Sequence, residues 1–249
     1  MRRLLAVGGA LLGGVLLVPV IALAVTFGGL APAEDGATLP GGARLVRAGV
    51  SNVYVLPTGS GVALVDCGDE RDGAAIRAAI GGAVVEAIFL THGHRDHLAA
   101  CHQFGGARVY AMTEEVPVVE GRAVARGPVP RWRAPAVDLD VRVTHPVADG
   151  DVVRVGALDV RGFRVPGHTD GSAAWLAAGT LFVGDSLFVE ADGDVRGAAW
   201  IFSDDTAVSR ASMRALFERL AGDVRAVAPA HSGPLLDVDG ERVARGLAE

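Results

Sequence analysis

Four side chains of the kinds that bind metal ions lie within six residues, in the segment THGHRDH that begins at Thr91. Two histidines separated by one residue in an extended chain project to the same side and can bind one ion, while the aspartate and histidine after them turn towards a second position. Three more residues of these kinds occur later, in short turns that also contain small residues. The seven candidate ligands are His92, His94, Asp96, His97, His168, Asp185 and His231.

Each candidate ligand follows a run of apolar residues that predicts a strand. Residues 86–90 form a predicted buried strand directly before THGHRDH. Predicted strands at 158–165, 181–183 and 225–228 run into the turns PGHTDGS, GD and PAHSGP. Loops at strand ends are positioned by a rigid sheet, so this arrangement indicates a functional site. A solvated polar loop does not explain why all four turns follow strands.

The other predicted elements alternate between strands and helices, as in an α/β fold. Short β-branched runs between turns predict an antiparallel meander over residues 43–66. Four prolines make residues 113–140 loop-rich. The remaining predicted elements are helices at 70–80, 98–104 and 206–220 and strands at 108–110, 152–155 and 173–176.

With this His-x-His-x-Asp-His signature, followed by a histidine, an aspartate and a histidine, the chain resembles the metallo-β-lactamase superfamily over about residues 43–235. The resemblance implies a four-layer αββα sandwich with two metal ions at one edge of its sheets. The family usually has a glycine pair just after the signature, where this chain has Leu98, Ala99 and Ala100. The implied ligands are His92, His94 and His168 for the first ion, Asp96, His97 and His231 for the second, and Asp185 for both.

Mixed imidazole and carboxylate ligation is typical of zinc, although iron and manganese also accept it. Two ions about 3.5–4 Å apart can share a hydroxide, which is a nucleophile at neutral pH, and can polarise a carbonyl or phosphoryl oxygen. We therefore expect two divalent metal ions per chain, zinc before iron or manganese. We also expect a hydrolase in which Asp96 is both a ligand and the catalytic residue.

The segments PGHTDGS and VGDSLF are most similar to the glyoxalase II and lactonase branch of the family. This similarity implies hydrolysis of a thioester, a lactone or a similar ester-like bond in a small-molecule substrate. True β-lactamases of this fold have cysteine or serine in place of Asp185, so amide hydrolysis of their type is the alternative. Residues 232–249 are too few for the helical substrate-binding domain of glyoxalase II itself. An iron-containing redox or oxygen-using protein, or a non-catalytic metal-binding protein, is a further alternative.

Several residues outside the ligand set are assigned less directly. Asp66, at the end of the predicted strand VALVD, either supports the metal-binding loop or is an ordinary turn carboxylate. His102 and His145 are expected to be structural or solvated. Cys67 and Cys101 are expected to be reduced, buried thiols, with a disulfide as the alternative.

Two loops are candidates for selecting the substrate. Residues 113–140 carry basic and aromatic side chains that either contact an anionic substrate or lipid headgroups, or are simply solvated. Residues 188–205 carry Trp200 and Phe202, which form either the walls of an acyl pocket or part of the core. The basic and aromatic side chains of the first loop are Arg122, Arg126, Arg131, Trp132 and Arg133.

The N-terminal composition predicts a leader or a membrane anchor. Arg2 and Arg3 precede an uncharged apolar run that continues to Ala33, longer than the roughly 20 residues that cross a bilayer. We expect residues 1–33 to be a hydrophobic helix, either a signal peptide cleaved at its Ala-Pro-Ala end or, as the length favours, an uncleaved transmembrane anchor. Residues 34–249 are then the hydrolase domain, exported to the periplasmic or extracytoplasmic side and membrane-bound through this helix if it is retained.

The formal net charge of −6 gives an acidic protein. Domains that bind nucleic acid normally gather lysine and arginine on one face and are basic. The charge therefore argues against nucleic acid as a partner, and the sequence carries no indication of the oligomeric state.

Overall fold

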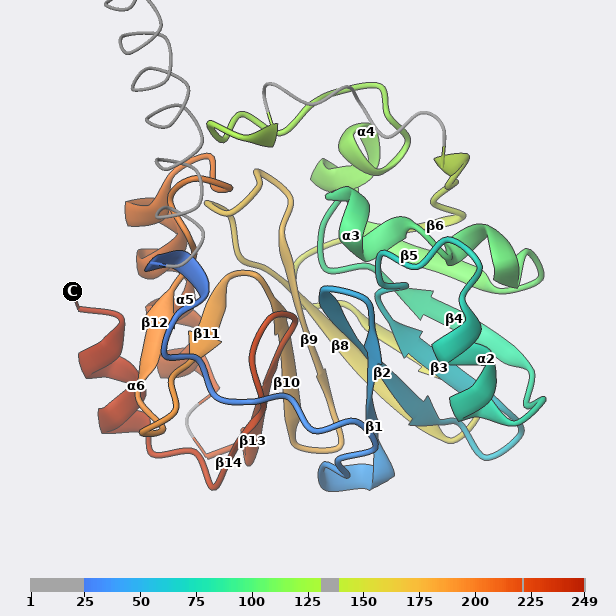
Figure 1. Ribbon diagram of the computed structural model, residues 1–249, viewed down its shortest axis with the longest axis horizontal. Helices are drawn as coiled ribbons and strands as arrows, with labels where there is room; N and C mark the ends of the chain where they lie inside the picture. The colour runs from blue at the N-terminus through green and yellow to red at the C-terminus, as the bar shows by residue number, and fades with distance from the viewer. Residues whose placement is uncertain (1–24, 131–138, 221, 249) are drawn as a thin grey trace, which may run out of the picture.

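Two six-stranded sheets lie face to face in the computed structural model, which describes residues 25–130, 139–220 and 222–248 (Figure 1). In the first sheet the strand order follows the sequence, with β1 to β3 antiparallel and β3 to β6 parallel. The predicted antiparallel meander over residues 43–66 is confirmed. The strands are β1 (Arg44–Ala48), β2 (Ser51–Pro57), β3 (Val62–Val65), β4 (Val85–Phe89), β5 (Arg108–Met112) and β6 (His145–Val147).

The second sheet has the order β14-β13-β10-β9-β8-β7. Its strands are antiparallel except for β10 and β13, which run parallel. A separate two-stranded hairpin, β11 (Leu187–Val189) with β12 (Val195–Gly197), follows β10. The strands of the second sheet are β7 (Val152–Val155), β8 (Leu158–Arg164), β9 (Ala173–Ala177), β10 (Thr180–Gly184), β13 (Ala226–Pro229) and β14 (Leu235–Leu236).

Large aromatic side chains fill the layer between the sheets. Tyr54 and Phe89 of the first sheet pack with Trp175 and Phe182 of the second, and all four are at most 2% exposed. Burying a side chain of this size contributes about 1.5–3 kcal/mol relative to leaving it in water. The Trp175 Nε1–H donates to the Leu90 carbonyl at 3.0 Å. This bond ties the second sheet to the end of β4, where the signature begins.

Helices cover the outer face of each sheet, so the chain forms the predicted four-layer αββα sandwich (Figure 1). Ile76 and Leu98 pack on the first sheet, and Met213 and Val243 pack on the second. The helices are α2 (Ala74–Ile80), α3 (Arg95–Leu98), α4 (Val116–Val119), α5 (Thr206–Arg219) and α6 (Gly240–Gly246), with 3-10 turns η1 (Pro40–Gly42), η2 (Cys101–Phe104) and η3 (Thr113–Glu115).

The segment after the signature is broken, so the prediction of one helix over residues 98–104 is wrong. Helix α3 ends at Leu98, and the separate 3-10 turn η2 follows it. The Ala99 N–H donates to the Gly68 carbonyl at 3.0 Å rather than to a carbonyl one turn earlier. The α-helical hydrogen-bond ladder therefore cannot continue past this residue.

Cys67 and Cys101 form a disulfide, so the prediction of reduced thiols is wrong. Their Cα atoms are 5.3 Å apart, within the range that a disulfide spans. Backbone hydrogen bonds place them there, because the Cys67 N–H donates to the His97 carbonyl at 2.8 Å, next to the bond between residues 99 and 68. The bridge therefore fastens the end of β3 to the segment that follows the signature.

Most of the predicted N-terminal helix, residues 1–24, lies outside the described residues. Residues 25–27 are helical, and an extended stretch follows in which Leu30 pairs with Glu190. The Ala31 N–H donates to the Val189 carbonyl at 2.9 Å, and its carbonyl accepts from the Gly233 N–H at 2.8 Å. Within the described part of the chain, no helix is long and apolar enough to cross a membrane.

Candidate metal centre

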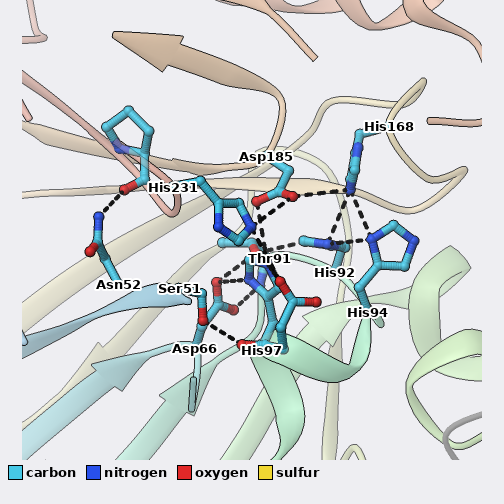
Figure 2. Close-up of polar contacts among 12 residues, drawn as sticks. Ser51, Asn52, Asp66, Thr91, His92, His94, His97, His168, Asp185 and His231 are labelled. Carbon is cyan, nitrogen blue, oxygen red and sulfur yellow. Dashed lines mark hydrogen bonds and ion pairs between the residues drawn. The ribbon is translucent and has the colours of Figure 1, made fainter. Parts of the chain in front are cut away.

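The structure brings all seven predicted ligands together at one edge of the sandwich, and Figure 2 labels all of them except Asp96. They come from both sheets, because the signature follows β4 and the other ligands follow β8, β10 and β13. They divide into two clusters, and within each cluster the ligand atoms lie within 4.8 Å of one another. The first cluster contains His92, His94, His168 and Asp185; the second contains Asp96, His97 and His231.

Three ring nitrogens of the first cluster converge on one point. The His92 Nε2 lies 2.9 Å from the His94 Nδ1 and 3.1 Å from the His168 Nε2, and the latter two atoms are 3.0 Å apart. Ligands about 2.0–2.1 Å from a tetrahedral zinc ion lie about 3.3 Å from one another. The triangle of nitrogens therefore has nearly the size that such an ion requires.

The second cluster is built around carboxylate oxygens. The His231 Nε2 lies 3.2 Å from the Asp96 Oδ2, and the His97 Nε2 lies 3.6 Å from the same oxygen. Asp185 stands between the clusters: its Oδ1 lies 3.3 Å from the His97 Nε2, and its Oδ2 lies 3.2 Å from the His231 Nε2 and 3.7 Å from the His168 Nε2. A carboxylate in this position can contribute one oxygen to each of two ions.

Hydrogen bonds fix the ring orientation and tautomer of His92 and His168. The Thr91 hydroxyl donates to Asp66, so its oxygen accepts the His92 Nδ1–H at 3.1 Å. The Ser203 hydroxyl donates to the Ala199 carbonyl, so its oxygen accepts the His168 Nδ1–H at 3.0 Å. In both rings Nε2 keeps its lone pair and faces the cluster, as a metal ligand must.

His97 and His231 are oriented in the same way, by different acceptors. The His97 Nδ1–H donates to the Asp66 Oδ2 at 2.7 Å, and the His231 Nδ1–H donates to the Val50 carbonyl at 2.9 Å. His94 is the exception, because its Nδ1 is the atom that faces the cluster. Its Nε2 must then carry the proton.

Asp66 supports the metal-binding loop, which decides between the two roles left open for it. Its Oδ1 accepts the Thr91 N–H at 2.8 Å, and its Oδ2 accepts both the Thr91 hydroxyl and the His97 Nδ1–H. Asp66 has a φ of 61°, in the left-handed region that non-glycine residues seldom adopt. The backbone is thus held in an unfavourable conformation where the carboxylate must turn towards the signature.

The turn that carries His231 is held by side chains of β2. The Asn52 Nδ2 donates to the carbonyls of Pro229 and Ser232, at 3.1 and 2.8 Å, and the Tyr54 hydroxyl donates to the Pro229 carbonyl at 2.6 Å. Burial raises the pKa of Tyr54 far above its ordinary value, so the hydroxyl remains a donor. The first sheet therefore positions a ligand of the second.

Two positions that directly precede ligands require glycine, because neighbouring atoms leave no room for a Cβ. Gly184 precedes Asp185 at a φ of 53°, and a Cβ there would lie 2.6 Å from the Thr91 Oγ1. Gly167 precedes His168 at a φ of 127°, and a Cβ there would lie 2.1 Å from the Ser209 backbone nitrogen. Any larger residue at either position would displace the ligand that follows it.

The histidines of the first cluster are neutral at physiological pH. Burial, together with neighbouring His97, lowers the pKa of His92 well below its ordinary value. Burial and the neighbouring His94 lower the pKa of His168 to about 3, and burial lowers that of His94. Three neutral rings with lone pairs facing one another at about 3 Å repel one another unless a cation lies between them. The donor set therefore fits a divalent metal ion.

In the second cluster the carboxylates determine the pKa values of the histidines. Burial by itself would lower the pKa of His97, but Asp185, Asp66 and Asp96 raise it well above its ordinary value. Burial would likewise lower the pKa of His231, but Asp185 and Asp96 raise it to about 10. In the metal-free protein, protons on these rings supply the positive charge that the carboxylates require.

We expect the affinity for metal to depend on pH at the second cluster and to be nearly independent of pH at the first. His97 and His231 must release protons to bind a cation, because their pKa values are raised above neutrality in the metal-free protein. Between about pH 6 and pH 8, the apparent affinity of the second cluster should rise by about ten- to hundredfold per pH unit. His92 and His168 are already neutral there. Chelator competition at several pH values measures both slopes, and two equal slopes would contradict the assignment.

Glu115 is a residue of the site that sequence reasoning missed. It is 1% exposed, its Oε1 accepts the Gly93 N–H at 2.8 Å, and its Oε2 accepts the Thr169 hydroxyl and the Gly171 N–H at 2.9 and 3.0 Å. Burial raises its pKa to about 7, against the lowering effect of these three bonds. One carboxylate thus ties the His92–His94 loop to the His168 loop.

Replacing Glu115 by alanine should lower the free energy of unfolding by about 3 kcal/mol, because three buried donors lose their acceptor. The first cluster should also bind metal more weakly, while the second changes less. Chemical denaturation and metal titration measure the two effects. The matched control is Glu114→Ala, since its neighbour Glu114 is exposed and lies 3.7 Å from Arg164. Equal effects from both substitutions would show that Glu115 has no special role.

The remaining predicted residues that the structure describes lie outside the two clusters. His102 and His145 are exposed. Trp200 is 65% exposed, and Phe202 is half-buried. In the loop-rich stretch, the Arg126 Nε lies 3.3 Å from the Asp204 Oδ2, and Arg122 pairs with Glu120 at 2.9 Å. Residues 131–138, with Arg131, Trp132 and Arg133, lie outside the described residues.

Comparisons with known proteins agree with this geometry. The family model of the Metallo-beta-lactamase superfamily matches residues 46–231. A hydroxyacylglutathione hydrolase of Anaeromyxobacter dehalogenans is 38% identical over 143 residues, which are 57% of this chain and 48% of that protein. The chain spans about half the length of the curated relatives that it matches.

Two solved structures show the likeness of the fold. A metallo-beta-lactamase family protein from Thermus thermophilus aligns with a TM-score of 0.58 at 26% identity, over 84% of this chain and 79% of that chain. A B3 metallo-beta-lactamase with an active-site glutamic acid aligns with a TM-score of 0.62 at 23% identity, over 92% and 93%, which shows the fold alone. With the family model spanning most of the sequence and all seven ligand positions assembled, the chain belongs to the metallo-beta-lactamase superfamily.

Proposed function

We propose that this protein is a dinuclear zinc hydrolase that cleaves a thioester or lactone bond in a small molecule. The position of Asp185, with one oxygen towards His97 and the other towards His231 and His168, carries the dinuclear proposal. The seven residues would hold two ions: His92, His94 and His168 the first, Asp96, His97 and His231 the second, and Asp185 both. Zinc suits a set of five imidazoles and two carboxylates.

Two bound ions would supply an activated water and polarise the substrate carbonyl. Asp96 is the more accessible carboxylate of the clusters, with its side chain 31% exposed, compared with 7% for Asp185. It can therefore orient the attacking water and accept its proton on the solvent-facing side. Its pKa stays low despite burial because His97 and His231 stabilise the charged form, so the carboxylate is ionised at neutral pH.

The leaving group favours a thioester over an amide. A thiolate departs without being protonated, because thiols ionise near pH 8.5. An amine must receive a proton before it leaves. The hydroxyacylglutathione hydrolases among the relatives also support a thioester substrate for this chain. Amide hydrolysis of the β-lactamase type is the second class to test.

A substrate panel tests the proposal on metal-loaded protein, with thioesters, lactones, phosphodiesters and β-lactams measured under the same conditions. We expect two zinc equivalents per chain by elemental analysis and the highest kcat/KM on a thioester or a lactone. Full activity with one equivalent would contradict the dinuclear proposal. Highest activity on β-lactams would favour the amide alternative, and a coloured, iron-rich protein that is inactive on the panel would favour redox chemistry.

We also propose that the catalytic domain is exported and remains attached to the cytoplasmic membrane. Arg2 and Arg3 before the apolar run support insertion with the N-terminus inside. The Cys67–Cys101 disulfide supports an oxidising compartment, because such bonds rarely persist in the cytosol. Protease added to intact spheroplasts should digest the domain, and full protection would contradict its export.

A further inference from the structure

Two phenylalanine rings lie against His231 on one side of the second cluster, and a third packs on one of them. The ring centroid of Phe27 lies 5.6 Å from that of His231, and the Phe188 ring stacks on His231 at 6.3 Å. Phe27 also lies 6.3 Å from Phe188 and 6.1 Å from Phe202. These distances are typical of aromatic pairs in contact. The three rings, which we call the aromatic wall, come from three separate parts of the chain.

The wall retains accessible apolar surface beside polar groups. Phe188 is 2% exposed, but Phe27 and Phe202 are half-buried. The rings between the sheets, such as Phe89 and Trp175, are fully buried. Phe27 is thus a partly exposed ring that contacts a candidate metal ligand. At such a ring the apolar part of a substrate would meet the protein while its reacting carbonyl lies at the ions.

The N-terminal segment is fastened so that Phe27 is held at the site. The Arg196 Nη2 donates to the Thr26 carbonyl at 2.8 Å, at the end of the helical residues 25–27. The same guanidinium lies 5.9 Å from the Phe188 ring centroid. The Ala191 N–H donates to the Gly29 carbonyl at 2.8 Å, and Leu30 and Ala31 pair with the β11 hairpin.

The wall is also linked to the first cluster. A tight turn carries Phe202 and Ser203, closed by the Phe202 N–H donating to the Ala199 carbonyl at 3.1 Å. Ser203 orients His168 through its hydroxyl. The turn that contributes Phe202 to the wall therefore also positions a ligand of the other cluster.

We propose that Phe27, Phe188 and Phe202 form a specificity-determining wall that binds an apolar acyl or aromatic group of the substrate. This rests on the proposed hydrolase function and narrows its substrate class to those with an apolar acyl part. It also makes residues 25–31 part of the active site, so a signal peptide cut after Ala33 would remove one ring of the wall.

The binding of two thiols that coordinate zinc through the same groups tests the wall without any need for substrate turnover. Mercaptoacetate and 2-mercapto-3-phenylpropanoate share a thiolate and a carboxylate, and the second adds a benzyl group. Calorimetry on the full chain loaded with two zinc equivalents gives both dissociation constants. We expect the phenyl compound to bind about tenfold more tightly, and Phe27→Ala to reduce this ratio to about one while mercaptoacetate changes by less than about twofold.

Val25→Ala is the matched control, because Val25 lies on the same segment with 69% of its surface exposed, and it should leave the ratio unchanged. Phe202→Ala removes a ring of the wall that comes from another part of the chain, and it should reduce the ratio as well. This second variant keeps the test valid if Phe27→Ala does not fold. Equal binding of the two thiols by the unaltered protein would overturn the proposal. So would a ratio that both phenylalanine variants leave unchanged.

The two proposals fail in different ways. Suppose that the unaltered chain hydrolyses nothing in the panel but binds the phenyl thiol more tightly than mercaptoacetate, and that Phe27→Ala abolishes this preference. The wall then stands and the proposed hydrolase substrate class fails. If it hydrolyses acetyl and phenylacetyl thioesters equally and the thiol ratio is one, the proposed function stands and the wall fails.

Discussion

Asp185→Asn is expected to lower kcat/KM on the best substrate of the panel by at least about a thousandfold. The Asp185 carboxylate lies within reach of histidine nitrogens in both clusters, at 3.7 Å from His168 and 3.2 Å from His231. The amide has nearly the same shape but no charge and only one oxygen, so it cannot serve both ions. Steady-state kinetics and elemental analysis should show the loss of rate together with a fall from two metal equivalents towards one.

The control for this substitution is His145→Ala. His145 is exposed on β6, far in sequence from the ligands, and its Nδ1 lies 2.8 Å from the Thr144 hydroxyl. Its replacement should leave rate and metal content unchanged. If both variants lost activity equally with intact circular dichroism, Asp185 would not be the bridging residue.

Replacing Cys67 and Cys101 together by alanine is expected to lower the free energy of unfolding by about 3–4 kcal/mol. The bridge joins residues 34 positions apart, and closing a loop of this length restricts the unfolded chain by about that amount. The loop contains His92 and His94 of the first cluster and His97 of the second, so metal affinity should fall as well. Chemical denaturation and metal titration of the double variant measure both effects.

Alkylation without reductant provides the direct check on the disulfide. The unaltered, unfolded chain should take up no alkylating agent and should have a mass two daltons below that of the reduced chain. Reduction before denaturation should reproduce the stability loss of the double variant. Two alkylated cysteines in the untreated protein would show that the bridge does not form.

The candidate ligands can be predicted because their signal is local. His168 and His231 each follow an apolar run that predicts a strand, and those strands are β8 and β13. The predicted strand at residues 152–155 coincides with β7, and the predicted helix at 206–220 with α5 to within one residue. Asp205 begins α5 by accepting the N–H groups of Ala207 and Val208 at 2.9 and 3.0 Å, a capping signal that is visible in sequence.

What the sequence does not reveal depends on contacts between distant segments. Glu115 acts through Gly93 and Gly171, which approach one another only when the two sheets pack together. Its neighbourhood in sequence looks like a loop. The prediction of reduced thiols fails because the spacing of two cysteines does not fix the distance between their Cα atoms. Backbone hydrogen bonds between residues 67–68 and 97–99 set that distance, and the residue types at these positions do not predict such bonds.

The short hairpin of β11 and β12 escapes prediction for a related reason. Three-residue strands have little propensity of their own, and this hairpin is extended by Leu30, which pairs with Glu190 just after β11. Composition places Leu30 in a separate leader. When residues 1–33 are assigned to a leader, Leu30 is not recognised as a pairing partner of the hairpin.

The distribution of ligands over the two sheets has a consequence for the order in which the protein matures. Synthesis proceeds from the N-terminus, so the ligands of the first cluster are all present once Asp185 has been made, whereas the second cluster waits for His231. His231 reaches its place only when β13 pairs with β10 and the Asn52 side chain forms its hydrogen bonds to the turn. A chain that ends before β13 would therefore have every ligand of the first cluster but lack His231, so the second site can be completed only after β13 has paired with β10.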